Sequence, residues 1–267
     1  MPATSSLGTA LITGASSGIG EVYADRLAKR GYDLILVARN IDRLGTLANR
    51  LTTETGQNIE IISADLGKAT DRNTVETRLR DDAAISLFIN NAGVTLGGGP
   101  LAEANVDELE TMLDVNVTAL TRLAAAASAG FVQRQRGTIV NISSVMALLD
   151  TPNTAAYGAT KAYVLSFTHS LDLELAPQGI QVQVVLPGYT RTPMIALGAG
   201  IPSEYVMEVD DMVDAALAGL DHKELITIPG QHNDGDYARL LEARTSLVSN
   251  LIANRPAPRY LTTDAAA

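Results

Sequence analysis

The regular alternation of short apolar segments with longer amphipathic segments limits most strongly what this chain can fold into. Strand-length apolar runs occupy residues 9–13, 33–38, 59–63, 86–89, 138–142, 181–186 and 225–228. Segments of helical periodicity lie between them, at residues 19–30, 40–55, 70–80, 106–133, 154–176 and 210–220. Near-continuous apolar strands that alternate with helices predict an α/β fold of the Rossmann type, a doubly wound parallel sheet of about seven strands with helices on both faces.

The same pattern predicts a single domain over residues 1–267, because no linker-like stretch and no internal repeat divides it. Two irregular stretches follow predicted strands, at residues 97–100 and about 187–208. Ligands of open α/β sheets bind outside the carboxyl ends of the strands, so both stretches are candidate substrate loops. A further helix at about 236–253 carries an apolar stripe. We expect the tail from about residue 230 to pack beside the 187–208 loop or across a subunit contact; capping of the sheet edge is the alternative.

Charge and composition restrict the partners. The formal net charge is −10, which argues against nucleic acid and anionic membranes. The chain has no cysteine, its first residues do not resemble a signal peptide, and no apolar run approaches the roughly 18 residues of a membrane span. We therefore expect a cytoplasmic protein that acts on a small molecule. The three histidines form no cluster with metal-ligand spacing, so no metal site is predicted.

A glycine-rich turn follows the first predicted strand. The stretch TGASSGIG places Gly14, Gly18 and Gly20 just before a predicted helix. Glycines there allow the backbone to approach a phosphate, and the helix N-terminus supplies free N–H groups. A plain glycine-rich connector is the alternative. The second strand ends Val37-Ala38-Arg39 without the carboxylate that would accept from a ribose 2′-hydroxyl. Arg39 can pair with a 2′-phosphate, which favours NADP over NAD; a solvated surface arginine is the alternative.

Tyr157 and Lys161 stand four residues apart in the Ala-rich stretch AAYGATKAY, on one face of a predicted helix. A phenol is a poor proton acceptor near neutral pH, and a nearby cation would lower its pKa. The pair is therefore a candidate for acid–base chemistry. Two side chains on a helix surface without any chemistry are the alternative.

With TGASSGIG, the stretches NNAG (90–93), LDVNV (113–117), NISS (141–144), YGATK (157–161) and PGYTRT (187–192) occur in one order. Together they resemble the short-chain dehydrogenase/reductase family in its short, single-domain form, over residues 9 to about 228. The resemblance implies that Tyr157 is the catalytic acid/base and Lys161 its partner. It implies that Ser144 orients the substrate, with Ser143 as the competitor, and that Asn116 completes a proton relay.

The resemblance also implies the cofactor contacts and the assembly. The cofactor-binding residues it implies are Gly14, Ser16, Ser17, Gly18, Ile19, Gly20, Arg39, Asp65, Leu66, Asn90, Ala92, Gly93, Tyr157, Lys161, Pro187, Gly188, Thr190 and Thr192. Family members pair the helices at 106–133 and 154–176 across a dimer interface, commonly within a homotetramer. For Asp65 a helix-capping or turn role is the alternative.

The hypothesis that results is an NADP(H)-dependent carbonyl reductase or alcohol dehydrogenase. A nucleotide-sugar epimerase or dehydratase, or a regulator that senses NADP without turnover, are the alternatives. The expected pocket wall is mostly apolar, which suggests an uncharged aldehyde, ketone or secondary alcohol, although the nearby cation Arg191 would argue against it. The wall residues are Val94, Leu96, Met146, Leu148, Leu149, Tyr189, Met194 and Ile195.

Overall fold

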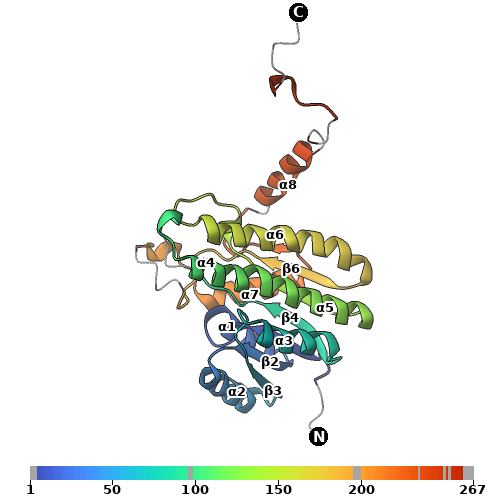
Figure 1. Cartoon of the computed structure of the whole chain (residues 1–267). Helices are drawn as coiled ribbons and strands as arrows, with labels where there is room; N and C mark the ends of the chain where they lie inside the picture. The colour runs from blue at the N-terminus through green and yellow to red at the C-terminus, as the bar shows by residue number, and fades with distance from the viewer. Residues whose placement is uncertain are drawn as a thin grey trace, which may run out of the picture. The chain divides into compact units, whose positions relative to one another are not determined.

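The computed structural model describes residues 5–95, 99–194, 200–233, 235–248, 251 and 254–260 (Figure 1). The chain divides into two compact units, Met1–Pro229 and Gly230–Ala267. The first unit contains the complete sheet and every predicted site residue. The second contains the helix α8 (Gly235–Val248) and a short 3₁₀ turn, η7 (Pro258–Tyr260).

The first unit is built on a seven-stranded sheet in the order β3-β2-β1-β4-β5-β6-β7, and every described pairing of its strands is parallel. The strand order reverses direction between β1 and β4, as in doubly wound folds. This confirms the predicted sheet. The strands are β1 (Thr9–Thr13), β2 (Asp33–Ala38), β3 (Ile59–Ser63), β4 (Ile85–Asn90), β5 (Thr138–Ile142), β6 (Gln181–Val185) and β7 (Ile226–Thr227).

Helices cover both faces of the sheet, as the continuous apolar strands require. On one face α1 (Gly18–Lys29), α2 (Ile41–Thr55) and α7 (Val209–Asp221) share an apolar core with the strands. On the other face the core is formed with α3 (Ala69–Asp81), α5 (Leu120–Arg134) and α6 (Ala155–Leu175). Because the strands are all parallel, their carboxyl ends and the loops that follow them lie at one edge of the sheet.

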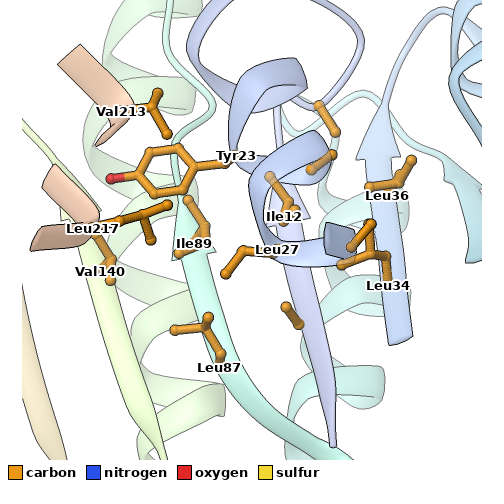
Figure 2. Close-up of a cluster of buried hydrophobic side chains, with 14 of the residues drawn as sticks. Ile12, Tyr23, Leu27, Leu34, Leu36, Leu87, Ile89, Val140, Val213 and Leu217 are labelled. Atoms are coloured by element: carbon orange, nitrogen blue, oxygen red, sulfur yellow. The ribbon is translucent and has the colours of Figure 1, made fainter. Parts of the chain in front are cut away.

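Figure 2 shows the core between α1, α7 and the strands, with the ring of Tyr23 between Ile89, Val213 and Leu217. Tyr23 is fully buried, and its hydroxyl has no hydrogen-bond partner among the described residues. Burial raises the pKa of this phenol well above its ordinary value. The ring contributes apolar packing, whereas the hydroxyl is a polar group that is buried at a cost.

The predicted helix at 106–133 is interrupted. It begins as α4 (Val106–Leu113), continues as a π-helical turn (Asp114–Ala119) and ends as α5. The hydrophobic periodicity of the sequence did not predict this interruption, because the apolar pattern continues on both sides of a single π-helical turn. The stretch Val106–Arg134 also contains an 18-residue window with a mean hydropathy of 1.3, which is long and apolar enough for a membrane span, against the expectation of no such run. Half of that window, 50%, is buried, which is typical of a core helix.

Candidate active site

A groove of about 730 Å³ lies at the carboxyl edge of the sheet, beside β1, β2 and β4. It is lined by eleven of the predicted cofactor-binding residues. They are Gly14, Ser16, Ser17, Gly18, Ile19, Arg39, Asp65, Leu66, Ala92, Gly93 and Thr192. Sequence stretches that are far apart in the chain thus meet in one groove, because parallel strands place their following loops at the same edge.

The glycine turn has the conformation that a phosphate cradle needs. Gly14 and Gly18 have φ of 67° and 57°, which other residues rarely adopt. A Cβ on Gly20 would lie 2.3 Å from the carbonyl oxygen of Gly14. With any other residue at position 20, α1 could not pack so close to the glycine turn. Gly20 therefore serves packing beneath the groove, and Gly14 and Gly18 line it. Gly18 and Ile19, at the start of α1, line the groove, and the first N–H groups of a helix have no partner within the helix, which suits a dinucleotide pyrophosphate.

Two arginines lie beside the end of β2. Arg39 and Arg43 both line the groove, both are exposed, and neither makes an ion pair within the described part of the chain. The backbone N–H of Arg43 donates to Asn40 Oδ1 at 3.0 Å. This hydrogen bond caps α2 and fixes the position of the Arg43 backbone in its first turn. The sequence interpretation singled out Arg39 alone. Arg43 follows Arg39 by four residues, across the start of a predicted helix, and this spacing could have identified it as a second candidate for the 2′-phosphate.

The loops after β3 and β4 contribute differently from the expectation. Asp65 lines the groove, and its Oδ1 also accepts from the Gly67 N–H at 3.1 Å, so it is a turn residue as well. Asn90 does not reach the groove. It is buried, and its amide donates to Leu120 O at 2.9 Å and Asn141 Oδ1 at 3.1 Å inside the domain. Asn91, which was not predicted, lines the groove instead.

The residues after β6 divide between groove and scaffold. Thr192 lines the groove and would lie 3.1 Å from a Cβ on Gly18. Pro187, Gly188 and Thr190 do not line it. The Pro187 carbonyl accepts from Val145 N at 3.0 Å, and the buried Thr190 hydroxyl donates to Gly188 O at 3.1 Å. These three residues shape the turn that carries Thr192.

Tyr157 lies near the start of α6 with Ser144 beside it. Burial raises the pKa of the Tyr157 phenol, and a hydrogen bond with Ser144 opposes that increase. This direction is opposite to the lowering that we expected from Lys161. Both serines are buried: Ser144 also accepts from Met146 N at 3.2 Å, whereas Ser143 donates to Lys161 O at 2.8 Å. Of the two serines, only Ser144 is next to the phenol.

Lys161 is buried, one helical turn after Tyr157. Its Nζ donates to the Ile142 carbonyl at 3.1 Å and lies 5.7 Å from the centre of the Tyr157 ring. No carboxylate pairs with it among the described residues. Burial lowers the pKa of Lys161 to about 8. A Cβ on Gly93, which lines the groove, would lie 3.6 Å from its Nζ, so the ammonium lies behind Gly93, although Lys161 is not itself among the lining residues.

Asn116 lies within the π-helical turn, a feature that is often found at functional sites. Its side chain is fully engaged. Oδ1 accepts from Val94 N at 2.8 Å, and Nδ2 donates to Val94 O at 2.8 Å and to Thr160 Oγ1 at 3.2 Å. The amide therefore fixes the loop after β4.

A second cavity, of about 440 Å³, lies on the other side of Tyr157. It is bounded by the turn η1 (Leu101–Glu103), by α4 and by the start of α6, and Tyr157 is part of its wall. None of the residues expected to form the substrate wall lines it. Leu96 and Ile195 of that expected wall lie outside the described residues. Arg191, the nearby cation, is paired with Glu208 at 2.7 Å.

No group of three or more potential metal ligands occurs within the described ranges. The site thus consists of a groove that fits a dinucleotide, a separate cavity, and the Tyr–Lys pair, in which Lys161 is buried and Tyr157 is half-buried. This is an arrangement for transfer between a nucleotide cofactor and a small organic molecule.

Comparison with known proteins agrees with this geometry. A family model described as short chain dehydrogenase matches residues 8–197. A short-chain dehydrogenase from Sphingobium yanoikuyae, solved in complex with NADPH, is 48% identical, with 95% of this chain and 100% of that chain covered and a TM-score of 0.91. A bulky-bulky ketone specific alcohol dehydrogenase from Comamonas testosteroni is 46% identical over 96% of this chain and 99% of that one, with a TM-score of 0.89.

Among curated proteins, an uncharacterised oxidoreductase from Staphylococcus epidermidis is 32% identical over 220 residues, which are 82% of this chain and 93% of the relative. Fold, motif order and family model agree over most of the chain. It therefore belongs to the short-chain dehydrogenase family and is an NAD(P)-dependent oxidoreductase.

Proposed function

We propose that the protein is an NADP(H)-dependent carbonyl reductase or alcohol dehydrogenase in which Tyr157 is the acid/base. The observation that carries this proposal is the position of the Tyr–Lys pair. Lys161 lies behind Gly93, which lines the groove, and Tyr157 lies in the wall of the cavity. A cofactor in the groove and a carbonyl compound in the cavity would therefore meet at these two side chains.

The preference for NADP is supported by charge. Arg39 and Arg43 follow the strand end at which NAD-binding Rossmann folds carry a carboxylate. Two guanidinium groups without ion-pair partners in the described chain suit a 2′-phosphate better than a 2′-hydroxyl. The Sphingobium relative, solved with NADPH, supports the same preference.

The bound nicotinamide would supply the hydride, and the residues of the chain would control the proton. Because burial raises the pKa of Tyr157, the phenol is protonated at neutral pH and is suited to donate to a substrate oxygen. Ser144 is close enough to Tyr157 to donate a second hydrogen bond to that oxygen. Lys161, with a pKa of about 8, is mostly cationic at neutral pH and stabilises the phenolate that forms after the transfer.

We also propose a homo-oligomer, a dimer or tetramer, that pairs α5 and α6 with the same helices of a second subunit. Support comes from apolar and aromatic side chains that these helices leave exposed. Val132 is 38% exposed, Tyr163 38% and Leu173 77%. Light scattering of the purified protein measures the assembly directly, and a monomer at micromolar concentration would contradict it.

The activity is tested by Tyr157→Phe. Tyr157, although predicted to contact the cofactor, is not among the residues that line the groove, so the variant should bind NADPH like the wild type. Its kcat should fall at least about a hundredfold, the usual contribution of a general acid. Cofactor binding is measured by fluorescence titration and turnover by NADPH oxidation with a panel of ketones. Near-normal turnover in this variant would remove the proposed mechanism.

A further inference from the structure

The cavity beside Tyr157 differs from the cofactor groove in the charge of its lining. Arg39, Arg43 and Lys68 line the groove together with two carboxylates. The cavity has no arginine, lysine or histidine among its described lining residues, and it has the carboxylates of Glu103 and Glu108. The two compartments that meet at the Tyr–Lys pair are thus suited to compounds of different charge.

Glu103 and Glu108 come from different elements, the turn η1 and the helix α4. Both are exposed, so they lie at the mouth of the cavity and not at its base. Neither carboxylate makes a salt bridge or a side-chain hydrogen bond with another described residue, although the Glu103 backbone N–H donates to Pro100 O at 2.9 Å. Their charges are therefore not neutralised within that part of the chain, and they act on whatever enters.

Apolar residues make up about half of the lining, beside the polar residues Thr95, Asn105, Asn153 and Thr154. The apolar lining residues are Pro100, Leu101, Ala104, Leu109, Met112, Ala155 and Ala156. Met112 is fully buried and closes the inner wall. A cavity of about 150 Å³ already holds a benzene molecule, so a volume of about 440 Å³ admits an aryl group with further substituents. Such a space is larger than a small aldehyde or methyl ketone can fill.

We propose that this cavity receives the larger, uncharged substituent of a ketone or secondary alcohol, and that Glu103 and Glu108 select against substrates on an anionic carrier. The inference rests on the proposed function and specifies its substrate class. An acyl group held on a phosphate-bearing carrier would bring several negative charges to a mouth that already carries two. A neutral aryl ketone meets no such repulsion and buries its ring on the apolar wall.

The charge part is tested with benzoylpropionate and its uncharged methyl ester, which place the same ketone in the cavity. The measured quantity is the ratio of kcat/KM for the acid to kcat/KM for the ester. In the double variant Glu103→Gln/Glu108→Gln this ratio should rise about fivefold at low salt, taking each charge to act over about 8 Å through water. The increase should shrink at high ionic strength, because these charges are exposed to solvent.

Glu110→Gln is the matched control. Glu110 lies on the same helix and is exposed, but it does not line the cavity. Glu110→Gln removes one negative charge, as each substitution of the double variant does, and should leave the acid-to-ester ratio of kcat/KM as in the wild type. An unchanged ratio in the double variant, or an equal rise in Glu110→Gln, would overturn the selection by charge.

The size part is tested by Leu109→Phe, which narrows the cavity without adding a polar group. The ratio of kcat/KM for an aryl ketone with two bulky substituents to that for a small methyl ketone should fall at least tenfold. The circular dichroism spectrum shows whether the variant is folded, and Ala156→Leu narrows the same space from α6. Unchanged ratios in both folded variants would overturn this inference alone. If the wild type turns over none of these carbonyl compounds, the proposed function itself fails.

Discussion

The buried charge of Lys161 should lower the free energy of unfolding of the native protein. Lys161 is buried, its Nζ has one carbonyl partner, and no carboxylate pairs with it in the described chain. Burial lowers its pKa from the ordinary 10.5 to about 8. Each pH unit of difference corresponds to about 1.4 kcal/mol between the two protonation states. At about pH 7 the unfolded chain and the native protein both carry the charge, so the native protein bears the full cost, about 3 kcal/mol.

The sign of the pH dependence follows from proton binding. Between the two pKa values the unfolded chain binds more protons at this residue than the native protein does, so the free energy of unfolding rises with pH in that window. Lys161→Met removes the charge. At about pH 7 the variant gains about 3 kcal/mol from the lost desolvation penalty, minus about 1 kcal/mol for the lost hydrogen bond. By about pH 10 the penalty in the wild type has fallen to about 1 kcal/mol.

Urea unfolding without cofactor, at both pH values, measures the difference. The free energy of unfolding of Lys161→Met minus that of the wild type should drop by about 2.5 kcal/mol from about pH 7 to about pH 10. Any constant packing effect cancels in this comparison. Lys68→Met, at a side chain that is 69% exposed, is the control and should show no such drop. If the two lysine variants behave alike, the ammonium of Lys161 is not desolvated and the reasoning is wrong.

Four further changes test other parts of the account. Ser144→Ala should lower kcat more than Ser143→Ala, which should instead lower the melting temperature because it removes a buried hydrogen bond to Lys161 O; the reverse ranking would reassign the serines. Arg39→Ala should weaken NADPH binding about tenfold in fluorescence titration and leave NADH binding nearly unchanged, unless Arg39 is only a surface residue. Tyr23→Phe should keep or raise the free energy of unfolding by up to about 1 kcal/mol, since the lost hydroxyl has no partner, and a clear loss in urea unfolding would point to a hidden partner. Truncation after Gly230 should leave a folded protein with altered kinetics or an altered number of subunits in light scattering, and if both are unchanged the tail has no role in the pocket or the assembly.

The strands and helices could be predicted from the sequence because each carries a complete local signal. Buried strands such as Asp33–Ala38 are apolar at nearly every position, and the structure reproduces the predicted bounds of that strand. Bounds shift where the signal weakens. The last strand is only Ile226–Thr227, shorter than the predicted 225–228, because it lies at the edge of the sheet and pairs on one side.

The candidate site was predictable where a motif fixes both a residue and its surroundings, as for the glycine turn and the Tyr–Lys pair. The site was not predictable where the tertiary fold decides which of several similar residues faces the groove or which distant elements meet. Asn90 is the last residue of β4 and Asn91 is the first residue after it, and only the direction that each side chain takes in the fold decides which of the two faces the core. The cavity beside Tyr157 brings η1, α4 and α6 together over more than fifty positions of sequence, and no local pattern marks it.

The π-helical turn at Asp114–Ala119 has a consequence for how this chain can change in length. A π turn holds about one residue more than an α turn over the same rise, and each residue of an α-helix adds about 100° of rotation. Leu120, Leu123 and Ala127 face the core only because that extra residue sets the phase of α5 relative to α4. A one-residue deletion there would turn the small, apolar side of α5 away from the sheet. The segment around Asn116 is thus a fixed spacer, and insertions or deletions should be tolerated in surface loops before they are tolerated here.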